Sequence, residues 1–225
     1  MTNELIFTII ALLDFPSVLV IARLGRSWLV ASIILNVLLI SVFGAKLVSI
    51  FGFVTNSGNV FYAAVFFATQ LLVEHYGKQE GYKSIFVGVL SIIFFILMSQ
   101  LIILTLGLAQ TEAINHAIET LFQAAPRIAF ASLLAYAFSQ TINIWIFDYL
   151  KHKTAGKLAW LRVNLSNLTG QLVDSLIFFT VAFYGKLPPG VLFQTLIVGF
   201  LLKVAVGAVS TPFFYLNLSF GKTEI

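Results

Sequence analysis

Residues Asn164 to Tyr184 read NLSNLTGQLVDSLIFFTVAFY, an apolar stretch long enough to cross a membrane. It carries a regular series of polar side chains, Asn164, Asn167, Gln171 and Asp174, spaced three, four and three residues apart. At about 100° per residue, these side chains fall within roughly 80° of one helix face. A membrane-buried Asp costs about 2.5–3.5 kcal/mol on an insertion scale, so it is expected to face other helices or a water-filled cavity. The stretch therefore predicts a membrane helix that lines a buried polar site.

The composition indicates an all-α polytopic membrane protein. Of the 225 residues, 60% are hydrophobic and 10% are charged, whereas soluble domains are about half apolar and about a quarter charged. The apolar stretches are continuous and do not alternate, which argues against a transmembrane β-barrel. The chain has no cysteine, which excludes disulfides and cysteine-ligated metals. Its first residues lack the basic region of a signal peptide, so the first apolar segment is expected to stay in the membrane.

Seven apolar segments are candidate spans. They cover residues 5–22, 28–51, 60–74, 84–108, 127–150, 165–184 and 191–216. The connections are short, so no soluble domain for nucleotide binding or separate catalysis is expected. The longest connection, residues 109–125, is predicted to form a short surface helix on the outer side.

The basic residues predict the orientation of these spans. With the N-terminus outside, nine basic residues fall in the inner loops and tail, and only Arg127 and Lys186 fall outside. The nine are Arg23, Arg26, Lys78, Lys83, Lys151, Lys153, Lys157, Arg162 and Lys222. This asymmetry follows the positive-inside rule and explains the net charge of +4 without nucleic-acid binding. The predicted topology is seven spans in a bacterial inner membrane, N-terminus out and C-terminus in.

Two acidic residues lie in the middle of predicted spans. Asp174 is at the same depth as Lys203 of the following span, which predicts an ion pair. The pair either binds a ligand or only fixes the helix register, and the sequence leaves both readings open. Asp14, close to Pro16, either faces the bundle or marks a segment that spans imperfectly.

Amide side chains on other predicted spans favour a shared cavity. Gln140 and Asn143 lie one turn apart, and Gln70 and Glu74 share a face at i, i+4. A single membrane amide more often joins two helices than binds a ligand, but their presence on several helices favours a polar site.

Enzyme classes find little support. The histidines, His75, His116 and His152, form no i, i+4 pair on a helix, which argues against an intramembrane metalloprotease. No G-x-S-x-G elbow, P-loop or G-x-G-x-x-G fingerprint occurs. The sequence thus predicts a non-enzymatic protein with no cofactor and no metal.

Three stretches resemble the queuosine precursor transporter family, once called the vitamin uptake transporter family. They are FATQLLVEHYGK from Phe67 to Lys78, RIAFASLLAYAFSQ from Arg127 to Gln140 followed by Asn143 and Phe147, and NLS…QLVDSLIF from Asn164 to Phe178. Lys203 resembles the lysine of the family's last helix. The resemblance covers about residues 28–216, with the motifs in the family's order. Gln70 and Asn143 stand where the family commonly has Asp. The ion coupling or substrate preference of this chain can therefore differ from that of the family.

The resemblance implies a six-helix bundle similar to the substrate-binding subunits of energy-coupling-factor transporters. The corresponding domains are an extra N-terminal membrane segment (1–27), a six-helix core (28–218) and a short cytoplasmic tail (219–225). It also implies import of a 7-deazaguanine base, a precursor of the modified tRNA base queuosine.

The polar residues fit such a ligand, because carboxylates and amides can accept from its N–H groups and an ammonium or amide can donate to its carbonyl. The predicted substrate-binding residues are Asp174, Gln171, Lys203, Asn143, Gln140, Gln70, Glu74 and Asn167. The predicted function is import by alternating access around a midplane site. Two alternatives are a substrate-capture subunit with a separate ATP-driven module and a non-transporting membrane scaffold or sensor. The predicted partners are the deazapurine and the lipid bilayer, and the oligomeric state is open.

Overall fold

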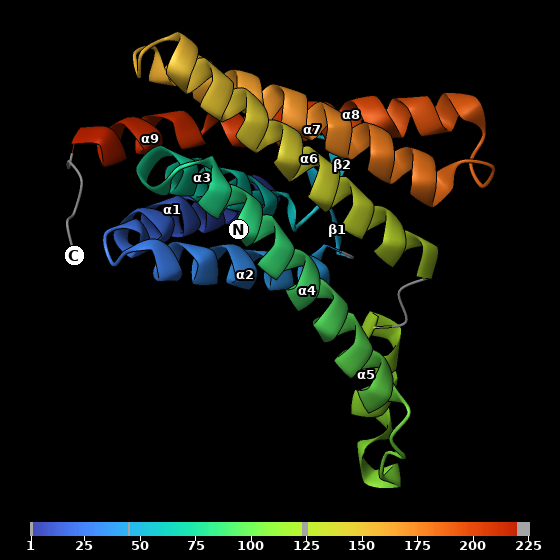
Figure 1. Ribbon diagram of the computed structural model, residues 1–225. Helices are drawn as coiled ribbons and strands as arrows, with labels where there is room; N and C mark the ends of the chain where they lie inside the picture. Colours follow the sequence, from blue (N-terminus) through green and yellow to red (C-terminus); the bar gives the residue numbers. More distant parts are fainter. Residues whose placement is uncertain (1, 45, 123–125, 220–225) are drawn as a thin grey trace.

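The computed structural model describes residues 2–44, 46–122 and 126–219, and nearly all of them are helical (Figure 1). The elements in chain order are α1 (Asn3–Ala22), α2 (Arg26–Phe43), β1 (Leu47–Ile50), β2 (Phe53–Asn56), α3 (Asn59–Tyr76), α4 (Lys78–Ile103), η1 (Ala109–Thr111), α5 (Glu112–Phe122), α6 (Pro126–Lys153), α7 (Ala159–Phe183), α8 (Pro189–Ala208) and α9 (Ser210–Ser219). The predicted all-helical class is confirmed. The predicted tail falls largely on residues 220–225, including Lys222, which lie outside the described residues.

Helix α3 occupies the centre of the bundle. Every residue from Tyr62 to Val73 is buried, and α3 contacts α1, α2, α4, α6, α8 and α9. Small side chains such as Ala63, Ala64 and Ala68 let neighbouring helices approach closely, as is usual in membrane bundles. At Gly170 of α7, an added Cβ would lie 2.5 Å from the Phe66 ring, so α7 can pass α3 this closely only with glycine. The polar residues of α3 are therefore held against several helices at once.

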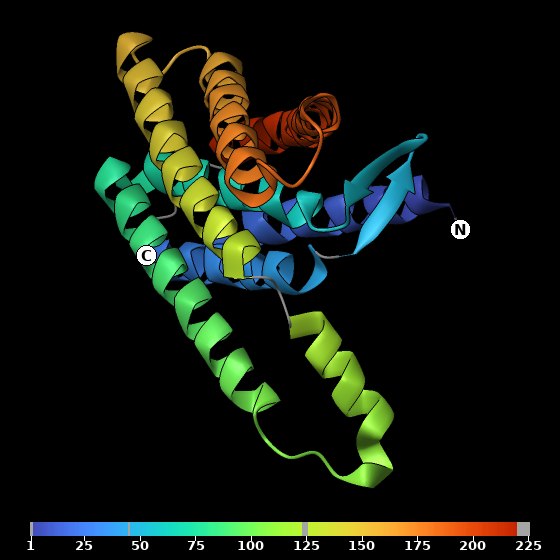
Figure 2. The same ribbon diagram turned by 90° about the vertical axis from the view of Figure 1, so that its right-hand side faces the viewer.

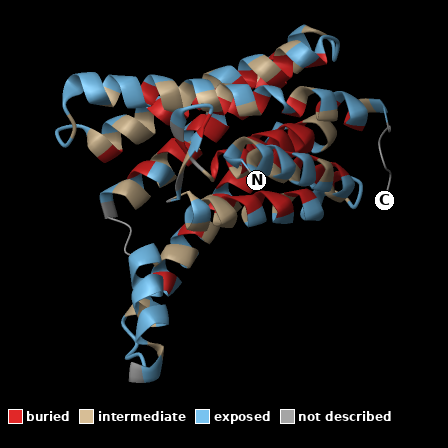
Figure 3. Cartoon of the chain, turned by 180° about the vertical axis from the view of Figure 1, so that it is seen from behind, coloured by how far each residue is buried: buried red, intermediate tan, exposed pale blue. Residues whose placement is uncertain are grey.

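Six helices within the described residues are long and apolar enough to cross a membrane. They are Asn3–Ala22, Arg26–Phe43, Lys78–Ile103, Arg127–Lys153, Ala159–Phe183 and Pro189–Ser219. Their outer faces carry exposed apolar side chains, among them Leu13, Phe86, Phe94 and Leu201, as lipid contact requires. Figure 3 shows the complementary pattern, with buried residues on the inward faces. The chain is therefore a multi-pass membrane protein.

The predicted span at 60–74 is helix α3, but α3 is too polar to count among these six helices. It carries Gln70, Glu74 and His75, which lower its hydropathy, and the surrounding helices shield it almost completely. A helix covered on all sides by protein needs less apolar surface than one that faces lipid.

The predicted span at 28–51 is wrong at its C-terminal end. Helix α2 ends at Phe43, and strands β1 and β2 then form an antiparallel hairpin with Ile50 paired to Phe53. Phe51 and Gly52 both have positive φ, as a two-residue hairpin turn of type I′ requires. The β-branched residues Val48, Ile50 and Thr55 favour strands, and their apolar character imitates a longer membrane helix in the sequence.

The predicted span at 191–216 is divided into α8 and α9 by a break at Val209. Pro212 has no N–H to donate to the carbonyl of Ala208, and its ring crowds that carbonyl. Val209 donates instead to Val206 at 3.1 Å, which tightens the last turn of α8.

The predicted surface helix is present as α5, and none of its residues is buried. Together with the end of α4 it projects from one end of the bundle (Figures 1 and 2). Gln100 of α4 donates to the carbonyl of Phe122 at 2.8 Å, a hydrogen bond that joins α4 to α5.

Candidate functional site

The predicted ion pair between α7 and α8 is present. Lys203 Nζ lies 2.5 Å from Asp174 Oδ2, and the two residues are 9% and 4% exposed. The hydroxyl of Tyr62 on α3 donates to Asp174 Oδ1, so the two carboxylate oxygens are held from two different helices. Ser139 Oγ of α6 lies 3.0 Å from the Tyr62 hydroxyl. Asp174 thus links four helices in the interior of the bundle.

The ring of Tyr62 also faces the ammonium of Lys203. Lys203 Nζ lies 5.0 Å from the Tyr62 ring centroid, within the range of a cation–π contact. Phe66, one turn further along α3, packs against the Tyr62 ring with centroids 5.3 Å apart. Aromatic surface therefore borders the buried charges.

A second polar group centres on Gln70 of α3. Its amide nitrogen lies within hydrogen-bond distance of Asn143 Oδ1, Asn167 Oδ1, Ser166 Oγ and the carbonyl of Val163, at 3.0–3.2 Å. An NH₂ group has two hydrogens, so these four acceptors compete for them. The cluster therefore has more acceptors than donors.

Several buried polar atoms around these groups have no hydrogen-bond partner within the described part of the chain. They are both amide atoms of Gln171, Nε2 of Gln140, Oε1 of Gln70 and Oγ of Ser175. Gln70, Gln140 and Gln171 are each 1% exposed, and Ser175 is 0% exposed. An unpaired buried polar atom costs about 1–3 kcal/mol, so this group of donors and acceptors is suited to a polar ligand.

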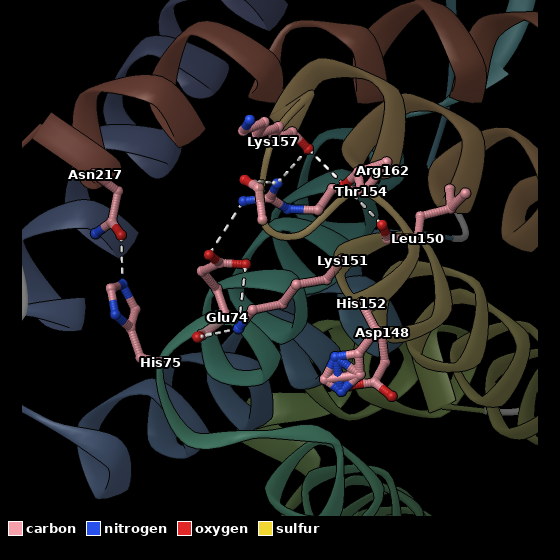
Figure 4. Close-up of polar contacts among 11 residues, drawn as sticks. Glu74, His75, Asp148, Leu150, Lys151, His152, Thr154, Lys157, Arg162 and Asn217 are labelled. Carbon is pink, nitrogen blue, oxygen red and sulfur yellow. Dashed lines mark hydrogen bonds and ion pairs between the residues drawn. The ribbon is translucent and has the colours of Figure 1, made fainter.

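Glu74 lies in a separate charged network at the end of α3, shown in Figure 4. Its Oε1 accepts from Arg162 Nη2 at 3.1 Å, and its Oε2 lies 3.5 Å from Lys151 Nζ. Arg162 is 1% exposed, donates to the carbonyls of Gly156 and Lys157, and lies against the rings of Phe147 and Phe214. The prediction that Arg162 is a loop residue is wrong, because α7 begins at Ala159 and places Arg162 in the core.

The same end of the bundle holds a further cross-helix contact. His75 Nε2 of α3 lies 2.5 Å from Asn217 Oδ1 of α9 (Figure 4). With the Glu74 network, it joins α3 to α6, α7 and α9. In the described ranges, no three His, Cys, Asp or Glu side chains gather closely enough to hold a metal ion.

A surface hollow of about 280 Å³ lies between α7 and α8 and extends to Asn167. Its lining is mainly apolar, with Trp160, Leu165 and Leu168 partly exposed. The central ion pair does not line this hollow. Because Asp174, Lys203 and Gln171 are each at most 9% exposed, the polar core is closed in this structure.

The polar residues described above lie in the part of the chain that is similar to known proteins. A family model described as "Putative vitamin uptake transporter" matches residues 56–217. The chain belongs to this family. It is therefore a membrane transporter and not an enzyme. The matched range contains every predicted site residue, whereas α1 and α2 precede it.

Curated relatives carry a more specific name. A "Probable queuosine precursor transporter" of Bacillus subtilis (strain 168) is 36% identical over 171 residues, which cover 76% of this chain and 74% of the relative. The "Queuosine precursor transporter" of Escherichia coli (strain K12) is 32% identical over 61% of this chain and 59% of the relative. A "Probable queuosine precursor transporter" of Haemophilus influenzae is 27% identical over 62% of this chain and 56% of the relative. No solved structure matches the chain.

Within the vitamin uptake transporter fold, the structure adds residues that the sequence analysis missed. Tyr62 and Ser139 are partners of the Asp174 group, and Ser166 is a partner of Gln70. Tyr62 lies eight residues before Gln70 and so shares its helix face, a periodicity that the sequence does contain. Apart from this spacing, nothing in the sequence distinguishes Tyr62 from the many other aromatic residues.

Proposed function

We propose that this transporter imports a queuosine precursor, a 7-deazaguanine base, across the bacterial inner membrane. The names of the three relatives support the substrate class. The observation in the fold that carries the proposal is the group of unpaired, buried donors and acceptors around Gln171. A protein that only needed to hold its helices together would be expected to satisfy these atoms internally.

The chemistry of these atoms suits a deazaguanine edge. Such a base donates from a ring N–H and an exocyclic amine and accepts at a carbonyl. Gln171 has one free donor and one free acceptor, Gln70 Oε1 is a free acceptor and Gln140 Nε2 is a free donor. The rings of Tyr62 and Phe66 border the same region and offer a surface on which a planar base can stack.

Asp174 and Lys203 take a role in binding in this proposal. The carboxylate accepts from the amine edge of the base, and the ammonium donates to the carbonyl. In the closed structure the two residues lie 2.5 Å apart, so a ligand with both donor and acceptor groups can enter between them and hydrogen-bond to each.

We further propose seven spans with the N-terminus outside, and transport by alternating access. The central helix α3 then counts as the seventh span, shielded from lipid by its neighbours. Because Asp174, Lys203 and Gln171 are each at most 9% exposed, a ligand can reach them only after helices move. A midplane site between helices that open to either side in turn satisfies this requirement.

The direct test is recovery of queuosine in tRNA. The host is a bacterial strain that can neither make the deazaguanine nor import it. Expression of this chain with low external precursor is expected to restore queuosine, and Gln171→Ala to reduce the recovery. Recovery equal to the empty vector would contradict the proposal.

Binding measurements separate the alternatives. Isothermal titration of the purified protein is carried out with the cyano and aminomethyl precursors, with queuine and with guanine. Tight binding without uptake in the host would point to a capture subunit that needs an ATP-driven module. Absence of binding to every base would point to a scaffold or sensor.

A further inference from the structure

A further polar cluster lies between α1 and α2, in the part of the chain that precedes the family match. Asp14 lies in the middle of α1, is partly buried, and lies near the side chain of Asn36 on α2. Ser32 lies one turn before Asn36 on the same face of α2, and both are 3% exposed. The two helices are consecutive and pack side by side (Figure 1). The cluster thus lies between α1 and α2, and both helices pack against the central α3.

Three oxygen atoms of this cluster have no hydrogen-bond partner in the described chain. They are Asp14 Oδ2, Ser32 Oγ and Asn36 Oδ1. The amide nitrogen of Asn36 is already engaged, because it donates to the carbonyl of Ser32 at 3.1 Å. Ser41 on the same helix donates its hydroxyl to the carbonyl of Val37 at 2.9 Å, as helix hydroxyls commonly do in apolar surroundings. Ser32 makes no such bond and keeps its oxygen free.

No neighbouring charge compensates the carboxylate of Asp14 among the described contacts. The other ionisable side chains of α1, α2, α3 and α9 for which contacts are described have partners elsewhere. Glu4 accepts from the Phe51 amide, Arg26 pairs with Glu80, Tyr62 binds Asp174, Glu74 pairs with Arg162, His75 binds Asn217 and Tyr215 accepts from the Trp160 amide. Tyr76, at the end of α3, is exposed.

We propose that Asp14, Ser32 and Asn36 bind a monovalent cation, Na⁺ or a proton, between α1 and α2. Both cations need an anionic oxygen, and Na⁺ as a hard cation is also satisfied by neutral amide and hydroxyl oxygens. An aspartate between membrane helices whose Oδ2 is buried and has no described partner is expected to pair with such a cation, since a bare carboxylate there is costly. The proposal does not depend on the identity of the transported substrate.

The position of the site links it to the transport core. Phe15, the residue after Asp14, packs edge-on against Phe67 of α3 with ring centroids 5.6 Å apart. Phe67 lies one turn before Gln70, the centre of the amide cluster. A cation that holds α1 against α2 thereby also fixes the position of the substrate-facing helix.

The test measures the midpoint of thermal unfolding of the purified protein without substrate. A cation that binds only the folded state raises this midpoint by mass action. In the first arm, NaCl replaces choline chloride at constant ionic strength and pH, and Na⁺ binding raises the midpoint of the wild type. In the second arm, the pH is lowered in choline chloride, and proton binding raises the midpoint by linkage.

Variants assign the response to the site. Asp14→Asn is expected to abolish the response in the arm where the wild type shows it, and Ser32→Ala to reduce a Na⁺ response. Ser41→Ala is the matched hydroxyl control, and Asp148→Asn, which loses a carboxylate paired with Lys78 at the edge of the bundle, is the carboxylate control. Both controls are expected to respond like the wild type.

Two results would overturn the proposal. One is a wild-type midpoint that does not change with Na⁺, together with a pH profile that Asp14→Asn leaves unchanged. The other is a Na⁺ response that both Asp14→Asn and Ser32→Ala retain in full. Ser32→Ala keeps every charge, so the result of the Na⁺ arm does not depend on whether Asp14→Asn folds. Loss of deazaguanine binding is a separate measurement and would leave this site in place.

Discussion

At the scale of single residues, the ion pair between Asp174 and Lys203 can act in binding or in structure alone. Taking a carboxylate and an ammonium out of water is costly, and their attraction repays this cost only with good geometry. Here the geometry is good, because Lys203 holds Oδ2 at 2.5 Å and Tyr62 donates to Oδ1. Removal of one partner leaves a buried charge unpaired and is expected to destabilise the protein by about 3–5 kcal/mol.

The double variant Asp174→Asn with Lys203→Gln separates the two roles. It removes both charges and keeps polar atoms, so its stability is expected to recover most of what each single variant loses. If the pair contacts the substrate, deazaguanine binding weakens by at least tenfold, about 1.4 kcal/mol. Titration calorimetry and thermal unfolding of the same preparations measure both quantities. Near-native affinity in the double variant would leave the pair a structural role only.

Tyr62 supplies a second residue-scale prediction. Tyr62→Phe keeps the ring that faces Lys203 and removes the hydroxyl that contacts Asp174 and Ser139. A hydrogen bond to a charged group contributes about 1.5–3 kcal/mol. If Tyr62 holds Asp174 in the position that contacts the substrate, loss of this bond is expected to lower substrate affinity by tenfold or more. The matched control is Tyr136→Phe, also buried, whose hydroxyl lies against Gly88 of α4 and makes none of the hydrogen bonds described for Asp174 and Lys203. Equal effects of both variants on affinity would contradict a role for Tyr62 in the site.

The site could be predicted from the sequence only where a helical period exposed it. Asn164, Asn167, Gln171 and Asp174 share one helix face by spacing alone, and the pairing of Asp174 with Lys203 followed from their common depth. Tyr62 could not be singled out, because a tyrosine among 23 phenylalanines looks like packing. Its role depends on how α3 lies against α7, a relation between helices that no local pattern contains.

At the scale of elements, the Glu74 network fixes where α6 and α7 meet α3. Arg162 donates from Nη2 to Glu74 and from Nη1 to the carbonyls of the turn that joins α6 to α7. Lys151 of α6 reaches the same glutamate and donates to its backbone carbonyl at 2.6 Å. The two rings beside the guanidinium come from α6 and α9. This end of the bundle is thereby held together by one buried arginine.

Arg162→Gln is expected to lower the free energy of unfolding by about 3–5 kcal/mol, because it leaves Glu74 short of its main partner. The combined variant with Glu74→Gln removes the unpaired charge and is expected to regain part of this loss. Arg26→Gln is the matched control, since it breaks a half-exposed pair with Glu80 worth at most about 1 kcal/mol. Thermal unfolding in detergent compares the three. A single Arg162→Gln variant as stable as the control would show that the network contributes little.

The elements themselves were predicted well where apolar length decides, and poorly where a short break decides. All seven predicted segments contain a helix, and α5 was expected from its loop. The hairpin after α2 was missed because strand residues such as Val48 and Ile50 are as apolar as a membrane helix. Pro212 marks the break before α9, but apolar residues continue on both sides of it, so hydropathy alone indicates one continuous span.

At the scale of the whole molecule, the bundle is arranged around a helix that is itself polar. Within the part of the chain that the structure describes, six surrounding helices have enough apolar surface for lipid. Helix α3 contributes Tyr62, Gln70 and Glu74 to three separate contacts along its length. A central polar helix within an apolar shell gives a transporter a site that lipid does not reach. Because its neighbours shield α3 from lipid, hydropathy alone does not select it as a membrane helix.

The last prediction concerns how these helices lie in the membrane. If α3 spans together with the six apolar helices, the chain crosses seven times and its two ends lie on opposite sides. The chain has no cysteine, so single cysteines report without background. Thr2→Cys and Lys186→Cys are expected to react with an impermeant maleimide in cells whose outer membrane, where there is one, has been permeabilised, and Lys157→Cys only after lysis. The loop charges give the reason, since basic residues remain on the inner side. Protection of Thr2→Cys with labelling of Lys186→Cys would place the N-terminus inside and remove one span from the topology.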